Sequence, residues 1–419
     1  MNEDPTVLLS ALGTELLDRI AGEFPAAVPG LAVATRLRRE YPADLVAAAV
    51  AQHELRLAAR AKFARASQML FTRAGYEQSS SEMIARHRAA RLAGAASVAD
   101  LCCGIGGDLA ALAATGEAAT GEAATGEAAT GEAAGRPLIA VDLNPVHARL
   151  ARHNAHVYGA GGRVHAVIAD VRDIRLTGTD AVFIDPARRD DARRFRAGTC
   201  EPPLAWCFEL AMKVPAVCVK AAPGLDTSLV PAGWEAEFIA DGRDLKEAVL
   251  WSPALSGPAA RRATILPGGH TLVRYPGPPV DIREPGEFLL DPSPAVTRAG
   301  LVEDLARQLG AWKIDPRIAF LSTASEVTTP FARTLTVIDS APWTEKRFAS
   351  RLRDLGVGAA DLRRRGLAGD VEQIRRRLRL QGPHRATIVL TRVRDRPWGL
   401  ICADPGSALT SHPAREPRA

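Results

Sequence analysis

Short apolar runs alternate with longer helix-like stretches from Val98 onward, and this alternation constrains the fold more than any other feature. The runs are SVADLC, PLIAVDL, RVHAVIAD, DAVFIDP and AVCVKAAP. Strands that alternate with helices form a parallel sheet, because each helix returns the chain to the end of the sheet at which the previous strand began. We therefore predict a doubly wound α/β domain over residues 93–270, with its ligand site at the carboxyl ends of the strands.

Three further regions flank the predicted α/β domain. Residues 1–92 are rich in Ala, Leu and Arg, with apolar residues three and four apart, which predicts helices. Pro and Gly residues at 275–279 predict a linker, and a mixed domain of strands and helices is expected over 284–403. Residues 404–419 are predicted to be a disordered tail.

A tandem repeat interrupts the α/β region. The unit Thr-Gly-Glu-Ala-Ala occurs four times over residues 115–134. No unit holds a large side chain to bury, which excludes a solenoid. We predict an expanded surface loop without a catalytic role, because the glycines disfavour the alternative of a frayed helical extension.

Composition excludes several classes of protein. No apolar run approaches the ~18 residues that span a bilayer, and the acidic start MNEDPTVLLSALG lacks the basic region of a signal peptide. The six cysteines include no CxxC pair, which argues against a disulfide framework and a zinc site. We expect a cytoplasmic protein with no membrane partner and no bound metal, and the sequence leaves the oligomeric state open.

Positive charge is concentrated near the C-terminal end. The chain has 53 Lys and Arg against 48 Asp and Glu, but residues 346–396 contain 15 Lys or Arg and five Asp or Glu. Such a concentration suits a polyanion such as RNA. The alternative is a solvated arginine-rich face, since arginine is abundant along the whole chain.

The stretch VADLCCGIGGDL joins the first predicted strand to a helix. It contains three glycines, which allow a tight turn and close approach of a ligand to the backbone: Gly104, Gly106 and Gly107. A dinucleotide-binding turn would need glycine in place of Leu109, and Asp108 would repel a pyrophosphate. The order acid-x-x-x-Gly-x-Gly-Gly instead resembles motif I of class I S-adenosylmethionine (SAM) methyltransferases. By this resemblance Asp100 faces the cationic methionine end of SAM, and a cationic ligand also tolerates Asp108.

Acids also end the next two predicted strands. Asp142 is expected to accept hydrogen bonds from ribose hydroxyls, with Asn144 beside it as a cofactor contact. Asp142 lies 38 positions after Gly104, where about 20 is usual, and extra repeat copies explain the excess. Asp170 at the third strand is expected to bind the adenine amino group, with Val171 covering the ring.

The fourth predicted strand ends in Asp185-Pro186-Ala187-Arg188. This resembles motif IV, D/N/S-P-P-x, of methyltransferases that modify exocyclic amines, where the acid or amide holds the target amino group. Ala187 replaces the second proline, and Arg188 replaces an aromatic residue that stacks on the base, as a guanidinium also does. The resemblance makes Asp185, Pro186 and Arg188 catalytic candidates, and a structural Asp-Pro turn is the alternative.

Lys220, at the end of the fifth predicted strand, is a further catalytic candidate. Together with Lys62, Asp185 and Glu247 it supplies the residue types of a 2′-O-ribose methyltransferase tetrad, in which lysine helps to deprotonate a hydroxyl. Cys218 lies within the strand and not in a loop after it, so we interpret it as a core residue and not as a nucleophile.

Several segments resemble one known family. They are KFARASQMLFTRAGYEQSSSEMIARHRAARLAG, DLCCGIGGDLAALA, FIDPARRD and LRRRGLAGDVEQIRRRLRLQGPHRATIVLTRV. They are similar to actinobacterial class I SAM-dependent methyltransferases with a THUMP-like C-terminal domain, over nearly the full length. The resemblance implies a Rossmann-like sheet, an N-terminal helical region, a C-terminal α+β domain and SAM as cofactor. THUMP domains bind RNA, commonly tRNA, which implies the same partner here by analogy.

A more distant resemblance concerns the segment before the glycine turn. YEQSSSEMIARHRA followed by DLCCGIGGD is similar to the trimethylguanosine synthase family, in which the segment before motif I closes over SAM. This similarity implies Gln78 and Ser80 as cofactor contacts.

These features together predict a SAM-dependent methyltransferase acting on tRNA or rRNA, at an exocyclic amine of a base. A methyltransferase of a small molecule or a protein would use the same fold. The other two hypotheses for the function are a non-enzymatic RNA-binding protein and an NAD-dependent enzyme.

Overall fold

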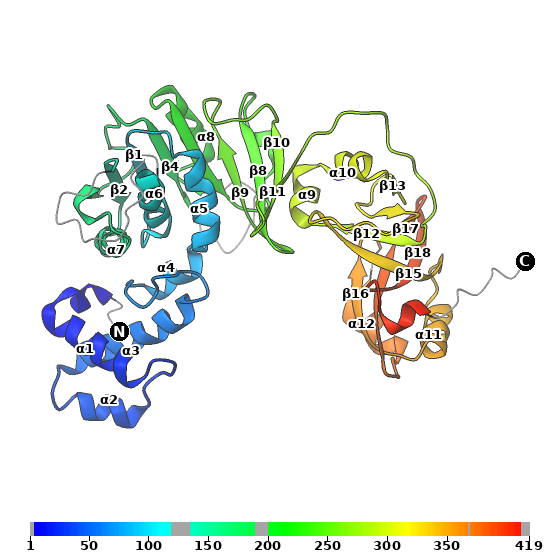
Figure 1. The fold of residues 1–419 in the computed structure, drawn as a ribbon, viewed down its shortest axis with the longest axis horizontal. Helices are drawn as coiled ribbons and strands as arrows, with labels where there is room; N and C mark the ends of the chain where they lie inside the picture. Colours follow the sequence, from blue (N-terminus) through cyan, green and yellow to red (C-terminus); the bar gives the residue numbers. More distant parts are fainter. Residues whose placement is uncertain (1–3, 119–134, 189–199, 368, 412–419) are drawn as a thin grey trace, which may run out of the picture. The chain divides into compact units, whose positions relative to one another are not determined.

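The structure is a computed structural model that describes residues 4–118, 135–188, 200–367 and 369–411 (Figure 1). The chain forms two compact units, the first made of Met1–Ala236 and Glu247–Ala260, the second of Glu237–Lys246 and Arg261–Ala419. The predicted boundary at residue 270 therefore differs from the division found, because the chain changes units within a pair of strands. No described helix combines the length and apolar character needed to cross a membrane.

The first unit begins with helices. They are η1 (Pro5–Leu9), α1 (Ala11–Glu23), α2 (Leu31–Leu37), α3 (Ala43–Ala59), α4 (Arg73–Gln78) and α5 (Glu82–Arg91). Side-chain caps start three of them. Asp4 accepts a hydrogen bond from the Thr6 amide, Ser10 from the Gly13 amide and Thr72 from the Gly75 amide. Apolar residues at helical spacing, such as Leu16 and Ile20, form their common core.

A mostly parallel sheet follows. Its elements are β1 (Val98–Leu101), α6 (Gly107–Ala118), β2 (Leu138–Asp142), α7 (Pro145–Val157), β3 (Val164–Ile168), β4 (Ala181–Ile184), α8 (Leu204–Glu209), β7 (Ala216–Ala221) and β9 (Asp244–Trp251). The strand order is β9-β7-β4-β1-β2-β3. Strand β9 is antiparallel to β7, and the other pairs in this series are parallel. This is the Rossmann-like α/β sheet that the alternation predicted.

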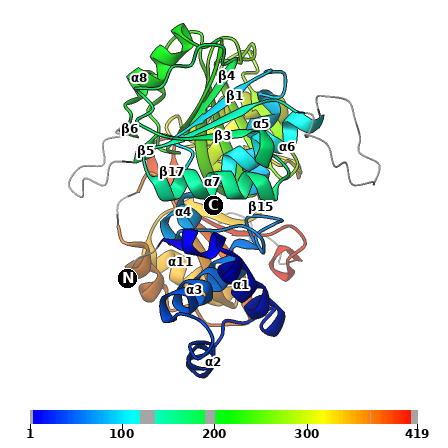
Figure 2. The same ribbon diagram turned by 90° about the vertical axis from the view of Figure 1, so that its left-hand side faces the viewer.

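Helices cover both faces of this sheet. Figure 2 shows α6 and α7 on one side and α8 on the other, and α5 packs against α6. Strands β1 and β4 are buried along their whole length, as expected for strands covered on both faces. Their carboxyl ends are therefore the part of the sheet that remains available to a ligand.

The start of the repeat differs from the predicted loop. Helix α6 continues to Ala118, within the first Thr-Gly-Glu-Ala-Ala copy, and the Thr115 hydroxyl bonds back to the Ala111 carbonyl at 3.2 Å. A single glycine does not outweigh the helix preference of the Ala and Glu residues beside it. Residues 119–134 lie outside the described chain.

The second unit contains a seven-stranded sheet of order β13-β14-β12-β15-β18-β17-β16. Three strands lie outside this sheet, in the order β11-β10-β8: β8 (Glu235–Asp241), β10 (Arg261–Leu266) and β11 (His270–Val273). The strands of the seven-stranded sheet and the helices of the unit are β12 (Phe288–Pro292), α9 (Pro294–Ala299), α10 (Val302–Leu309), β13 (Trp312–Lys313), β14 (Leu321–Thr323), β15 (Ala332–Pro342), α11 (Glu345–Asp354), β16 (Val357–Arg364), α12 (Val371–Leu378), β17 (His384–Val393) and β18 (Arg396–Ala403). Strands β16 and β17 are parallel and are connected through α12, whereas β17 and β18 form an antiparallel hairpin. The mixture of strands and helices agrees with the predicted α+β domain.

The C-terminal tail is ordered further than predicted. Ala408–Ser411 form a short 3-10 helix, and Leu409 is fully buried. Asp404 also accepts hydrogen bonds from Arg333. Disorder from residue 404 was therefore wrong up to residue 411, because one apolar side chain and one ion pair attach the segment to the sheet. Residues 412–419 lie outside the described chain.

Candidate active site

The strand order reverses between β1 and β4, and ligands of open α/β sheets bind at such a point. Strand β1 pairs with β2 on one side and with β4 on the other. Asp142 is the last residue of β2, Asp185 directly follows β4, and Asp108 lies in the first turn of α6. All three predicted site residues act electrostatically on Asp100 of β1. The structure thus concentrates negative charge at the carboxyl ends of the central strands.

Asp100 is the most deeply placed of these acids. Its side chain is 1% exposed, and neither carboxyl oxygen has a hydrogen-bond partner among the described residues. Burial raises the pKa of Asp100 well above its ordinary value, and the charges of Asp108, Asp185 and Asp142 raise it further. A buried carboxylate without a partner is costly, so the site favours a ligand that brings a positive charge to it.

Two glycines of the turn lie in the left-handed region, Gly104 with φ 52° and Gly106 with φ 79°, and Cys102 before them also does, with φ 57°. At Gly106 a Cβ atom would lie 2.7 Å from the Ala151 Cα atom of α7. At Gly104 no atom lies within 4 Å of the place where a Cβ atom would be. Gly106 therefore serves the packing of the turn against α7, whereas Gly104 leaves open space.

We predict different effects of alanine at these two positions. Gly106→Ala lowers the free energy of unfolding by about 2–5 kcal/mol, since left-handed strain adds to a clash with backbone. Gly104→Ala costs only about 1–2 kcal/mol, from the strain alone. Urea unfolding of both variants checks this, and equal losses would contradict the assignment of Gly106 to packing.

Asp142 is held by the glycine turn and by the start of α7. It accepts hydrogen bonds from the Gly104 amide at 2.9 Å and the Asn144 amide at 2.8 Å, and His147 Nδ1 lies 3.6 Å away. Burial acts to raise the pKa of Asp142, but these hydrogen bonds lower it overall. The Asn144 side chain accepts a hydrogen bond from the Val146 amide and so caps α7.

Leu143 was missed by the sequence reasoning. It lies directly after Asp142, and its large apolar side chain is 71% exposed. Because it is exposed beside the candidate ligand site, this side chain is available to an apolar part of a ligand. The available signal was a leucine between two polar residues at a strand end.

Asp170 is held by an arginine two residues further along the chain, and both of its carboxyl oxygens are engaged. Arg172 donates to it through Nη2 at 2.6 Å and Nε at 2.9 Å, and these bonds lower the pKa of Asp170 to about 2. Arg172 also bonds to Glu201 at 2.7 Å. Val171, by contrast, is buried.

Asp185 and Lys220 are brought together as a pair. Lys220 Nζ donates to Asp185 Oδ2 at 2.6 Å, across the neighbouring strands β4 and β7. The Lys220 side chain is 13% exposed and that of Asp185 is 36% exposed, so the carboxylate remains accessible. Pro186 is buried, and Arg188 lies in the short strand β5 (Ala187–Arg188). The Arg188 side chain lies outside the described part of the chain.

The four-residue tetrad is not assembled by the contacts described. Lys62 Nζ donates to the carbonyl oxygens of Tyr76 at 2.7 Å and Ser79 at 3.0 Å. Glu247 accepts hydrogen bonds from Ser80 and Arg88. Cys218 is fully buried, in agreement with its interpretation as a core residue.

The segment before α5 packs on the glycine turn. A Cβ atom at Gly75 would lie 2.3 Å from Ile105 Cγ2, and one at Gly107 would lie 3.6 Å from the Ser79 Cβ atom. Gln78 is exposed at the end of α4, while the Ser80 hydroxyl donates to Glu247 at 2.8 Å. The two predicted contacts are therefore near the turn, with Ser80 already engaged within the protein.

Arg88 is the second residue that sequence reasoning missed. Its side chain is 1% exposed and donates to both Asp108 and Glu247. No sequence signal separates one buried arginine from the other Lys and Arg residues of so basic a chain.

Comparisons with known proteins bear on this arrangement. A family model described as THUMP domain-like matches residues 332–404, and one described as a domain of unknown function (DUF8688) matches residues 3–59. An uncharacterized S-adenosylmethionine-dependent methyltransferase of Mycobacterium tuberculosis, from strains CDC 1551 and H37Rv, is 36% identical over 332 residues. This match covers 78% of the chain and 86% of the relative.

A solved structure shares the fold over most of the chain. A protein of Porphyromonas gingivalis W83 assigned as a methyltransferase superposes with a TM-score of 0.68 at 21% identity. The superposition covers 86% of this chain and 91% of that chain. At this identity the likeness concerns the fold alone.

Proposed function

The chain belongs to the S-adenosylmethionine-dependent methyltransferases and carries a THUMP-like domain, and we propose that its methyl acceptor is RNA, modified at an exocyclic amine of a base. The observation that carries the choice of RNA is an arginine-rich outer face on two helices of the THUMP-like domain. The accessible Asp185 at the end of β4 supports the choice of an amine. We also propose a cytoplasmic location.

The residues of the first unit fit the cofactor. SAM supplies an electrophilic methyl group on a sulfonium, and its sulfonium and ammonium are both cationic. The buried carboxylate of Asp100 is suited to the ammonium, and Asp142 is suited to accept ribose hydroxyls. Gly104 leaves room beside Asp142, and the exposed Leu143 is suited to cover the adenine ring.

Further residues around the same sheet edge are proposed to contact or shape the cofactor site. Asp170 and Val171 are proposed at the adenine end, where the Asp170 carboxylate would act while paired with Arg172. Gln78 is proposed as a contact from the exposed end of α4. Asp108, Asn144 and Ser80 are engaged by Arg88, Val146 and Glu247, so their part would be to shape the site.

Asp185 and Lys220 are proposed to serve the acceptor. A neutral amine attacks with its nitrogen lone pair, so its N–H groups need an acceptor that fixes their direction. The Asp185 carboxylate provides this acceptor and a destination for the proton that the amine loses. Lys220 holds the carboxylate from the adjacent strand by the 2.6 Å hydrogen bond.

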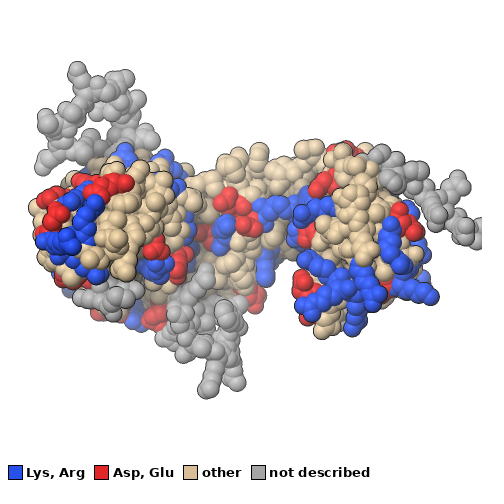
Figure 3. All heavy atoms as spheres, turned by 90° about the horizontal axis from the view of Figure 1, so that it is seen from below, with Lys and Arg blue, Asp and Glu red and all other residues tan. Residues whose placement is uncertain are grey.

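The outer face of α11 and α12 is the proposed RNA-binding surface. The two helices pack their apolar sides, including Phe348, Leu352 and Leu378, into one core. Figure 3 shows Lys and Arg side chains gathered over the part of the second unit that carries these helices. The exposed basic residues on or next to the two helices are Lys346, Arg347, Arg353, Arg375, Arg376, Arg377 and Arg379. This surface offers an excess of positive charge to phosphates.

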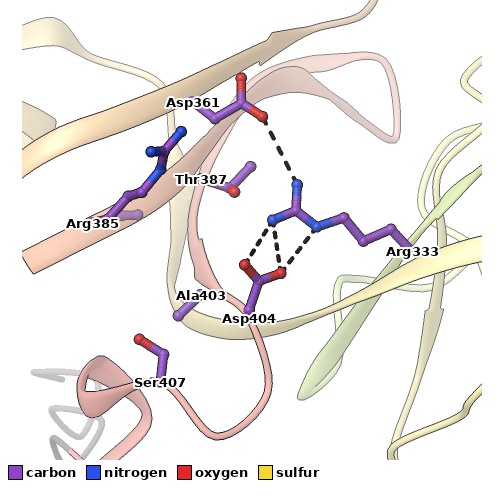
Figure 4. Close-up of a pocket in the computed structure, with 8 residues that line it drawn as sticks. Arg333, Asp361, Arg385, Thr387, Ala403, Asp404 and Ser407 are labelled. Carbon is purple, nitrogen blue, oxygen red and sulfur yellow. Dashed lines mark hydrogen bonds and ion pairs between the residues drawn. The ribbon is translucent and has the colours of Figure 1, made fainter. Parts of the chain in front are cut away.

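Within the helical face, Arg375 lies 3.8 Å from Glu372 and Arg377 lies 3.6 Å from Glu345. Further arginines of the basic region are engaged in closer ion pairs. Arg351 lies 3.2 Å from Asp339, and Arg365 lies 3.0 Å from Asp291. A cavity of about 310 Å³ among β15–β18 also contains matched charges (Figure 4). There Arg333 donates to Asp404 at 2.7 and 2.9 Å. Neither set offers the net charge of the helical face.

The aromatic residues of this domain favour recognition of the RNA backbone. Phe348 is 1% exposed, and the ring of Trp343 packs against it with centroids 4.9 Å apart. Trp398 donates through Nε1 to Ser340 at 2.8 Å. Phe348 is therefore closed to bases, and Trp343 and Trp398 are half-buried, so this domain offers much less stacking surface than positive charge. We therefore propose that this face binds a double-helical part of the RNA through its phosphates.

Neutralising part of the α11–α12 face tests the RNA proposal. The triple variant Lys346→Gln/Arg376→Gln/Arg379→Gln is expected to bind structured RNA about 10-fold more weakly at physiological salt. It should also reduce the slope of log K against log salt by about 2, since each phosphate contact contributes nearly one unit. Filter binding or anisotropy titrations over a range of salt measure both quantities.

A matched variant controls for the change in net charge. Arg283→Gln/Arg317→Gln/Arg392→Gln removes the same charge from exposed or half-exposed arginines that pair with Asp281 or Asp395. It is expected to keep the parental salt slope. If both triple variants lost RNA affinity and salt slope equally, binding would depend only on the net charge of the protein. That result would contradict the assigned surface.

A further inference from the structure

We propose that Arg88 is a positioning residue for the cofactor site, which fixes the glycine turn to β9 and to the segment before α5. The proposal concerns cofactor binding and does not depend on the identity of the acceptor. It can therefore be tested with SAM alone, and its failure would leave the RNA proposal untouched.

Arg88 joins three elements that border the site. From α5, its Nη2 donates to Asp108 in the first turn of α6, and its Nη1 donates to Glu247 on β9. Its Cζ atom lies 5.3 Å from the ring centroid of Phe183, which is on β4 two residues before Asp185. At 1% exposure, this guanidinium makes these contacts out of reach of solvent.

The second oxygen of Glu247 extends the contact to the chain before α5. Ser80 Oγ donates to Glu247 Oε2 at 2.8 Å, while Arg88 occupies Oε1. The neighbouring Ser79 packs near Gly107, the residue before Asp108. One hydrogen-bonded series therefore runs from Ser80 through Glu247 and Arg88 to Asp108, directly beside the glycine turn.

The chemistry of this series requires arginine. A planar guanidinium donates in several fixed directions and can bridge two carboxylates, whereas an ammonium acts as a point charge. Without that bridge, the carboxylates of Asp108 and Glu247 would lose the cation that they share. Asp108 would then be free to shift. Because Asp108 directly follows Gly107, such a shift would move the backbone against which the cofactor lies. Arg88 also acts to lower the pKa of Asp100.

Arg91, one turn further along α5, makes the same kind of contacts elsewhere. It donates to both oxygens of Glu235 on β8 at 3.1 and 3.2 Å. Its Cζ atom lies 4.5 Å above the ring of Trp251 at the end of β9. Arg91 thus pairs with a buried carboxylate and an aromatic ring as Arg88 does, but without bonding to the start of α6. This makes it a matched control.

The test compares Arg88→Lys with Arg91→Lys in the full chain. Both substitutions keep the charge and remove the guanidinium fork from α5. We expect Arg88→Lys to weaken the binding of SAM about 10-fold or more by calorimetry. Once an acceptor has been identified, the KM for SAM in turnover should rise as well, while kcat at saturating SAM stays within about threefold. Arg91→Lys is expected to bind SAM within about twofold of the parent.

A second variant keeps the proposal testable if Arg88→Lys fails to fold. Ser80→Ala leaves Arg88 in place and removes only the bond to Glu247, and it is expected to weaken SAM binding by about 2–5-fold. Equal weakening in Arg88→Lys and Arg91→Lys would make Arg88 a merely stabilising residue and overturn the proposal. Parental SAM binding in Ser80→Ala together with an unfolded Arg88→Lys would overturn it as well.

Discussion

Replacing Asp185 by alanine is expected to lower kcat by about 10²–10³-fold while the Kd for SAM stays within about threefold of the parent. The carboxylate is the accessible acceptor at the end of β4 and is oriented by Lys220 at 2.6 Å. It is proposed to hold the acceptor amine only, so its loss should leave the cofactor contacts in place. Single-turnover methyl transfer and calorimetry with SAM separate the two effects.

Further substitutions distinguish an amine acceptor from a hydroxyl acceptor. Asp185→Asn keeps an oxygen that accepts an N–H group and is expected to retain activity within about 10-fold of the parent. Lys220→Gln should lower kcat by about 10-fold through the orientation of Asp185. The exposed Asp173 serves as control, with parental activity expected for Asp173→Ala. Near-complete loss in Lys220→Gln with little effect of Asp185→Ala would instead favour deprotonation of a ribose hydroxyl by the lysine.

Replacing Asp100 by asparagine is expected to weaken SAM binding by about 30-fold or more, because a buried charge pair loses one member. The same change should stabilise the cofactor-free protein at neutral pH. The pKa of Asp100 is raised well above its ordinary value, first by burial and then by Asp108, Asp185 and Asp142. A carboxyl with a raised pKa destabilises the folded state at neutral pH, so the variant should unfold at a higher urea concentration than the parent.

The raised pKa of Asp100 also makes the stability of the protein and its affinity for SAM depend on pH. A carboxyl with a raised pKa binds its proton more tightly in the folded state, so its ionisation costs stability as the pH rises above the unfolded value. The stability difference between Asp100→Asn and the parent should therefore vanish at acid pH and grow as the pH rises. SAM affinity should fall when the pH is lowered through the pKa of Asp100 in the free protein. A variant without added stability and with parental SAM affinity would contradict the role given to Asp100.

The sheet and the position of its ligand site could be predicted because both depend on local sequence patterns. Apolar runs separated by helices give the parallel order. Asp142 ends one such run and Asp185 directly follows another, and the ends of these strands are easily located. The alternation also places Lys220 on the strand next to Asp185, since β7 pairs with β4. These inferences need only the periodicity of the sequence and the geometry of α/β sheets.

Contacts between distant segments could not be predicted in this way. Arg88, Asp108 and Glu247 lie far apart in the sequence, and only the packing of α5 between α6 and β9 brings them together. The same holds for Leu409, whose burial orders part of the predicted tail. Lys62 shows that a suitable residue type is not sufficient. The sequence offered it for a tetrad, but its ammonium donates to backbone carbonyls of the segment before α5.

The most direct measurement is transfer of a labelled methyl group from SAM to total RNA from a strain that lacks this gene. Digestion to nucleosides then identifies the methylated base and atom. The account predicts label in a single nucleoside, on an exocyclic nitrogen, which disappears with Asp185→Ala. Label confined to protein or small molecules, while SAM binding is confirmed separately, would contradict the assignment of RNA as the acceptor.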